Sequence, residues 1–258
     1  MSEPLDLSNP RQSVSAIVQA LAVLRYLGNL DRPQGVTAIS RALDISPSSC
    51  FNIVRTLVAE GMLDFDQADK SYALGAGTVE LAQRGLAQSG MLTRLRQDLF
   101  RLATDYQMTT SLFRVSHGER LTAIATAESG ADTQIQIMVG HRAPILAGAT
   151  GRCVAAFGSF SEAELERRFA DLRWHAAPRF ADFMAELEQV RRDGYAIDQS
   201  QFLAGVTSAA APIFDRTGAV AYCVAGTMFT GQHGVPTLRK IGEDIRATAL
   251  RASSSKPG

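Results

Sequence analysis

The sequence predicts an α+β protein in two parts, and three observations support this. A helical N-terminal stretch ends in two short extended runs, a longer C-terminal stretch mixes extended runs with helices, and a glycine-bearing segment lies between them. The chain has 258 residues, 46% hydrophobic and 20% charged. This composition excludes disordered, collagen-like and disulfide-scaffold proteins, and the length allows one large or two modest domains.

Charge and cysteine content narrow the class further. The 26 Lys and Arg residues balance 26 Asp and Glu residues, which excludes a protein that coats nucleic acid or membrane by bulk attraction but leaves room for a small basic face. The three cysteines, Cys50, Cys153 and Cys223, are far apart and lack ligand spacing, so we expect a reduced protein. Without a long apolar run or a signal-peptide pattern, we expect a cytoplasmic location and no membrane partner.

The N-terminal elements follow from apolar spacing and caps. A helical stripe between Ser13 and about Asn29 has Ser13 or Ser15 as its N-cap and carries Val14, Ile17, Leu21, Leu24 and Leu27. Pro33 and Gly35 interrupt it, and a second helix covers 37–43. Ser46 and Pro47 begin a third helix, which runs to about Glu60 before Gly61. The extended runs at 62–66 and 70–74 surround a polar turn at 67–69 and predict a hairpin.

Three helices and a hairpin between residues 11 and 75 predict a winged helix-turn-helix that binds double-stranded DNA. In the third helix Cys50, Ile53, Val54 and Leu57 share one face. The outer face then carries the candidate DNA-contacting residues Ser48, Ser49, Phe51, Asn52 and Arg55. Asn can bond adenine edges, Arg can bond guanine edges, and serine hydroxyls can hold phosphate. The alternative is a solvated helix face.

Local charge predicts weak binding by one module. Residues 11–63 carry five Arg against Asp31, Asp44 and Glu60, so 5 − 3 gives +2. The hairpin carries three Asp residues and one Lys, so we expect only Lys70 to contact DNA there. A module with so few cations needs a homodimer to reach useful affinity.

The rest of the chain predicts a helical linker at 76–106 and a sensor-like α+β domain at 107–252, before a disordered tail at 253–258. Six strands are expected, at 109–116, 120–129, 133–139, 194–198, 206–214 and 219–229, with a turn at His117–Gly118 between the first two. Helices are expected at 148–157, from Ser161 to about Asp171, at 180–193 and at 236–251. A largely antiparallel sheet flanked by helices follows.

From about residue 11 to residue 252 the chain resembles the IclR family of bacterial transcriptional regulators. The stretches that carry the resemblance are ISxSS at the third helix, GMLDFDQADKSYALG, GATGRCVAAF, LEQVRRDGYAID and GVTSAAAPIFDRTGAV. The resemblance implies a GAF-like mixed sheet as the effector-binding domain. It also implies homodimers, commonly paired into homotetramers, whose operator binding responds to a small catabolite.

The resemblance also implies an effector pocket. The backbone amides that hold a ligand carboxylate fall on Ala149 and Thr150 at a helix start, where free N–H groups can bind anions. The acidic position falls on Asp198, a small polar position on Ser208, and two serine positions on Ala225 and Thr227. Asp198 could instead start a turn, and Ser208 could be a small core residue.

This sequence departs from the family pattern in ways that favour an apolar pocket. Ala225 lacks a hydroxyl, Leu146 replaces a usual His, and Met228 replaces a usual Gly. Apolar residues expected nearby are Phe113, Ile135, Ile137, Met138 and Cys223, although Phe113, Met138 and Cys223 could instead be plain core residues. We therefore expect a larger, aromatic acid or amide as the effector.

Other function classes find little support. The sequence has no GxSxG, P-loop or GxGxxG pattern, so an enzyme is not expected, although Ser208, Cys153 or Cys223 leaves a hydrolase as a remote alternative. A small-molecule sensor that contacts proteins instead of DNA is the other alternative. The four His residues lie singly, so no metal or other cofactor is expected. The sequence leaves open the effector, the operator, and repression versus activation.

Overall fold

The computed structural model describes residues 14–30, 32–88, 90–116 and 120–253. The expected N-cap Ser13, the expected turn at His117–Gly118 and residues 254–258 of the expected tail lie outside this range. The chain divides into two compact units between Gly90 and Met91. Each unit is described by itself.

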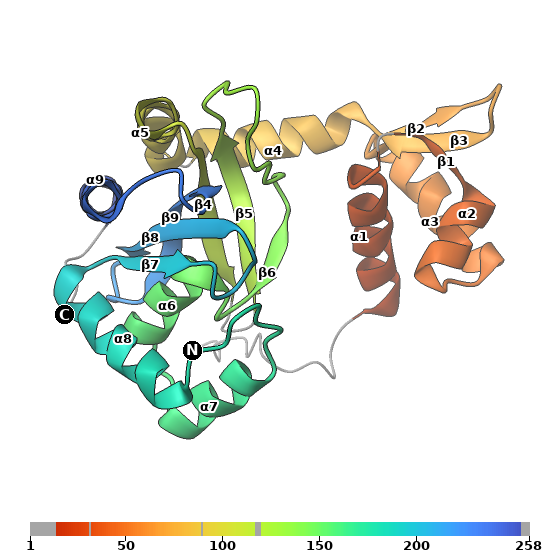
Figure 1. Ribbon diagram of the computed structural model, residues 1–258. Coiled ribbons are helices and arrows are strands. Elements are labelled where there is room, and N and C mark those ends of the chain that lie inside the picture. Colours follow the sequence, from red (N-terminus) through yellow and green to blue (C-terminus); the bar gives the residue numbers. More distant parts are fainter. Residues whose placement is uncertain (1–13, 31, 89, 117–119, 254–258) are drawn as a thin grey trace, which may run out of the picture. The chain divides into compact units, whose positions relative to one another are not determined.

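The first unit is a winged helix-turn-helix (Figure 1). Its elements are α1 (Ser15–Gly28), β1 (Gln34–Gly35), α2 (Val36–Leu43), α3 (Pro47–Ala59), β2 (Leu63–Asp66), β3 (Ser71–Leu74) and α4 (Ala76–Gln88). The strands form an antiparallel sheet in the order β1-β3-β2. The expected hairpin is confirmed, whereas the two-residue β1 was not expected from the sequence.

Local signals set the position of α3. The Ser46 side chain accepts a hydrogen bond from the Ser49 amide at 3.2 Å, and Pro47 occupies the first turn. Before α3, Asp44 ends α2 in the left-handed region at φ 51°. After it, Gly61 turns the chain toward β2 at φ +68°, a conformation that favours glycine. Both ends of α3 are therefore fixed by residues next to them in sequence.

The expectations for α1 are partly wrong. Its N-cap is Val14, not a serine, and no side chain caps it. Val23 and Leu27 are buried against α2 and α3, whereas Ile17 and Leu21 are 58% and 43% exposed. The N-terminal half of α1 therefore carries an apolar stripe that the first unit does not cover.

The second unit has six strands and five helices among its described residues. They are α5 (Gly90–Tyr106), β4 (Thr109–Ser116), β5 (Arg120–Ala127), β6 (Arg142–Pro144), α6 (Gly148–Phe157), α7 (Glu162–Ala170), α8 (Phe180–Asp193), β7 (Ala196–Gln199), β8 (Val206–Phe214), β9 (Val220–Phe229) and α9 (Val235–Ala252). The strands form one antiparallel sheet in the order β6-β5-β4-β9-β8-β7.

Helices cover both faces of this sheet (Figure 1). One core contains Leu95 and Leu99 of α5 and Ile241 of α9, so α5, expected in a separate linker, packs on the sheet. The other core joins the opposite face to α6, α7 and α8, with Cys153 and Phe183 fully buried. The alternating residues of β8 divide between these cores, which is the pattern of a strand covered on both sides.

One expected strand is wrong. Residues 133–139 are not a strand, and β6 at 142–144 takes the sheet edge. The segment instead lies against the sheet, where the Thr109 hydroxyl donates to the carbonyl of Ile135. Alternating polarity cannot distinguish such a covering segment from a strand, because both bury every second residue.

Candidate functional site

The outer face of α3 carries the candidate DNA-contacting residues. Phe51, Asn52 and Arg55 are exposed, with Phe51 at 45%. The Arg55 guanidinium lies 5.7 Å from the centre of the Phe51 ring, within the range of a cation–π contact. This contact orients an exposed cation along the same face as the Asn52 amide.

Serine hydroxyls gather at the start of α3. Ser46 donates to the Ser49 hydroxyl at 2.8 Å, and Ser48 lies 3.3 Å from Ser46. Ser48 is exposed and Ser49 is half-buried. A helix N-terminus with exposed hydroxyls suits a phosphate group, because the helix dipole and the hydroxyl donors act in the same direction.

The hairpin has one cation at its tip. Lys70 is exposed in a turn, with φ 51°. The carboxylate of Asp66 accepts from the amides of Ala68 and Asp69 at 2.8 and 3.2 Å. Asp66 therefore stabilises the turn that presents Lys70.

The second unit contains a cavity of about 230 Å³ between the sheet and the start of α6. Seven of the nine residues expected at an effector pocket line it: Phe113, Ala149, Thr150, Asp198, Ser208, Ala225 and Thr227. The cavity wall also includes Ile135 and Ile137. The other two residues do not line this cavity: Met138 is 61% exposed, and Cys223 is fully buried in the core.

A polar row crosses the cavity end of the sheet. Asp198, Ser208, Thr227 and Thr109 are opposite one another in register on four adjacent strands. The Ala149 amide, in the first turn of α6, donates to the Ser208 hydroxyl at 3.2 Å. The α6 N-cap, Ala147, makes no side-chain cap. The first turn of α6 therefore retains donor groups at the polar end of the cavity.

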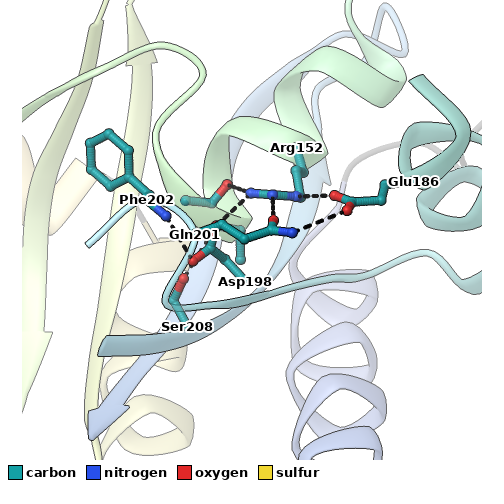
Figure 2. Close-up of polar contacts among 8 residues, drawn as sticks. Arg152, Glu186, Asp198, Gln201, Phe202 and Ser208 are labelled. Atoms are coloured by element: carbon teal, nitrogen blue, oxygen red, sulfur yellow. Dashed lines mark hydrogen bonds and ion pairs between the residues drawn. The ribbon is translucent and has the colours of Figure 1, made fainter. Parts of the chain in front are cut away.

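Arg152 is the residue that sequence reasoning missed, and Figure 2 shows its contacts. Its side chain is 1% exposed and donates to Asp198 at 2.7 Å, to Glu186 at 2.8 Å and to the Gln201 side chain. It also donates to the Gly148 carbonyl at 3.2 Å. One buried guanidinium thus joins α6, α8, β7 and the loop after β7.

The Arg152 contacts set the hydrogen bonding and the charge compensation of the Asp198 carboxylate. One Asp198 oxygen accepts from Arg152, and the other accepts from the Phe202 amide at 3.4 Å. An unpaired carboxylate in this place would repel an anionic ligand, whereas the Arg152 guanidinium offsets the Asp198 charge beside the cavity; the second carboxylate on Arg152, Glu186, is 37% exposed to solvent. The sequence signal that could have indicated the role of Arg152 is its place as the lone charged residue in the run 148–157. A buried arginine requires a partner, so this position predicts a buried acidic residue nearby.

The remaining cavity wall is mainly apolar. It includes Phe113, Leu121, Ile137, Ala143 and Val206. An apolar cavity of roughly 150 Å³ can hold benzene, so about 230 Å³ accommodates an aromatic ring with a small polar group. The volume and polarity therefore suit a small molecule with a polar end toward α6 and an apolar remainder.

The two cysteines considered as nucleophiles are buried. Burial raises the pKa of the Cys153 thiol to about 12 and the pKa of Cys223 well above its ordinary value. Neither cysteine is a nucleophilic thiolate near neutral pH. In the described ranges no three His, Cys, Asp or Glu side chains gather as metal ligands would. Among the helices described, none has the length and apolar character needed to cross a membrane.

A winged helix-turn-helix and a second unit with a ligand-sized cavity together define a DNA-binding transcriptional regulator with an effector domain. Family models give the particular family. The model described as "Bacterial transcriptional regulator IclR C-terminal" matches residues 84–254, and the IclR helix-turn-helix domain matches residues 16–67. The chain therefore belongs to the IclR family, whose members are DNA-binding regulators and not enzymes.

Individual relatives agree with this assignment. The transcriptional regulator BhcR of Paracoccus denitrificans is 27% identical over 92% of this chain and 82% of its own length. An IclR regulator structure from Alicyclobacillus acidocaldarius has a TM-score of 0.83 at 22% identity, covering 94% of this chain and 98% of that one. An IclR homologue from Microbacterium hydrocarbonoxydans, complexed with 4-hydroxybenzoate, has a TM-score of 0.74 at 23% identity, covering 93% and 100%.

Proposed function

We propose that this regulator controls a catabolic operon and that an aromatic acid in the cavity changes its binding to operator DNA. The observation that carries the proposal is the cavity, which has helix amides and hydroxyls at one end and an apolar wall elsewhere. The similar structure that contains 4-hydroxybenzoate supports this effector class. Such a protein acts where the chromosome is, in the cytoplasm.

The effector's carboxylate is held by the amides of Ala149 and Thr150, with Ser208 and Thr227 as hydroxyl partners. Its ring lies against Phe113 and the small side chain of Ala225. Asp198 is already paired with Arg152 and forms the cavity wall beside the effector's carboxylate. Because Asp198 is itself an anion, it makes no ion pair with the effector's carboxylate. Because the Ala225 side chain is small, it leaves room for the ring in the part of the cavity that a larger side chain at this position would fill.

Calorimetric titration tests the effector class. We expect 4-hydroxybenzoate or benzoate to bind more tightly than pyruvate or glyoxylate, because only the aromatic acids fill the apolar wall. Ala225→Leu fills part of the cavity and should weaken aromatic binding at least tenfold. Met138→Leu, outside the cavity, should not change it. Tight binding of the short acids alone contradicts the proposed effector class.

The DNA-contacting residues are Ser48, Ser49, Phe51, Asn52 and Arg55 on α3, with Lys70 on the hairpin. In a gel-shift assay with the DNA upstream of its own gene, Asn52→Ala and Arg55→Ala should each weaken binding by about 1–3 kcal/mol, the usual contribution of a base-specific side chain. The exposed Arg239→Ala on α9 is the control. If wild-type protein gives no shift while it binds effector, it is a sensor without DNA readout.

The protein binds DNA as a homodimer, and two dimers pair into a homotetramer. Support for self-association comes from the exposed apolar stripe on α1, formed by Val14, Ile17, Val18 and Leu21. Exposed contiguous apolar surface is typical of an interface. Ile17→Glu should shift the protein toward the monomer in sedimentation velocity and weaken DNA binding, whereas Ala42→Glu on α2 should do neither. A monomeric wild-type protein excludes the homodimer.

A further inference from the structure

A second cleft lies beside the effector cavity, and its lining is basic. It has a volume of about 650 Å³, and its charged residues are Arg120, Arg168, Asp171 and Arg173, so 3 − 1 gives +2. Arg168 pairs with Glu164 at 2.8 Å. Within the part of the chain that the structure describes, Arg120 and Arg173 have no ion-pair partner. Among the described residues, the cleft therefore offers two guanidinium groups without an ion-pair partner.

The rest of the cleft is apolar. Pro144, Ile145, Leu172 and Phe202 contribute to its lining. Guanidinium groups bind carboxylates in a bidentate manner, and an apolar floor favours a hydrocarbon spacer. These features together fit a molecule with two carboxylates joined by a short apolar chain better than an inorganic ion.

The cleft and the effector cavity share a wall. Phe202 lines both, and its amide donates to Asp198. On the cleft side, the amides of His175 and Ala176 donate to the carbonyl of Gln201 at 3.1 and 2.9 Å. The chain that carries Arg173 is thus hydrogen-bonded to the loop that Arg152 holds through Gln201.

We propose that this cleft is a second effector site, which binds a small dicarboxylate and is coupled to the first site through Phe202 and Gln201. A ligand that moves the 171–176 segment also moves the shared wall. The two ligands must then change each other's affinity by the same factor, because coupling between sites is reciprocal. The site is separate from DNA binding, so it can be tested without an operator.

Trp174 is the chain's single tryptophan and lies next to Arg173 in sequence, with its ring 6.1 Å from that of Phe202. Its fluorescence can therefore report on the cleft. The probes are adipate, hexanoate and inorganic phosphate, none of which absorbs where tryptophan does. We expect saturable adipate binding at least tenfold tighter than that of hexanoate or phosphate.

Variants locate the binding. Arg120→Gln and Arg173→Gln should each weaken adipate binding about tenfold or more, since each removes one charge-assisted contact. Arg142→Gln is the matched control, because Arg142 is an exposed arginine on β6 outside the cleft lining. Ala225→Leu, which fills part of the first cavity, should retain saturable adipate binding, so that adipate is not occupying that cavity; any change in adipate affinity then measures the coupling between the two sites.

Several results would overturn the proposal. If the two cleft variants bind adipate as well as wild type, or if Ala225→Leu abolishes adipate binding, the dicarboxylate does not occupy this cleft. Equal binding of phosphate excludes the dicarboxylate class. Aromatic acid binding and gel shifts are measured on the same wild-type preparation, so failure of the second site remains distinct from failure of the regulator function.

Discussion

Replacing Arg152 by methionine removes a guanidinium from the interior of the second unit while it retains much of the side-chain volume. The variant leaves Asp198, whose side chain is 3% exposed, with the Phe202 amide at 3.4 Å as its remaining side-chain hydrogen bond in the described structure. Breaking a buried pair from one side costs about 3–5 kcal/mol. Loss of the Arg152–Glu186 contact adds little to this free-energy cost, because the Glu186 side chain is 37% exposed and is solvated by water in the variant.

The assay is urea unfolding of the full chain followed by Trp174 fluorescence, which reports on the second unit. With a urea dependence of about 2 kcal/mol per molar, the midpoint should fall by about 2 M. Arg168→Met is the matched control. Its partner Glu164 is 31% exposed and Arg168 itself 24% exposed, so this loss should cost about 1 kcal/mol or less.

A double variant separates charge from packing. Arg152→Met with Asp198→Asn removes both charges, so it should recover at least half of the stability that Arg152→Met loses. If Arg152→Met lowers the free energy of unfolding no more than Arg168→Met does, the buried guanidinium does not compensate a buried carboxylate, and the reasoning is refuted. Failure of the double variant to recover would refute it equally.

Three further predictions concern packing, thiols and pH. Gly151→Ala should destabilise the second unit by about 3 kcal/mol or more in thermal unfolding, because a Cβ would lie 1.9 Å from the backbone of Leu146; an unchanged melting temperature contradicts this. Native protein should not react rapidly with a thiol reagent at pH 8, and denatured protein should expose all three thiols, because burial raises the pKa of Cys50, Cys153 and Cys223. Burial alone raises the pKa of Asp244, but hydrogen bonds from Lys240 and Tyr106 outweigh it and hold this pKa below its ordinary value. The resulting stability is present above the ordinary carboxyl pKa and is lost as the pH falls through the lowered one, so Asp244→Asn should flatten the acid limb of a stability–pH curve; an unchanged curve would exclude this contribution.

The sequence predicts best where the determinants are local. Ser46 and Pro47 begin α3, Gly194 ends α8, and Ser161 caps α7, because each signal lies within a turn of the element that it bounds. The two-residue strand β1 has no such signal. It exists because Gln34 pairs with Tyr72, far along the chain.

The candidate site was predictable only in part, for the same reason. The cavity residues Ala149, Asp198 and Ser208 came from resemblance to a family. No local pattern brings them together. Arg152 has partners 34 and 46 positions away, Glu186 and Asp198, so its role depends on the packing of α6 against α8 and β7.

The buried network also explains how a ligand in the cavity could select one arrangement of the second unit. A buried ion pair adds little stability beyond that of well-packed apolar residues, so the main consequence of Arg152 is geometric. It holds Asp198 directly and Phe202 through Asp198 and the neighbouring Gln201, and both Asp198 and Phe202 line the cavity. A ligand that contacts them gains this binding free energy only when the network is formed. Since a ligand shifts an equilibrium only by its differential affinity for two states, this network is where the proposed effector would gain that difference.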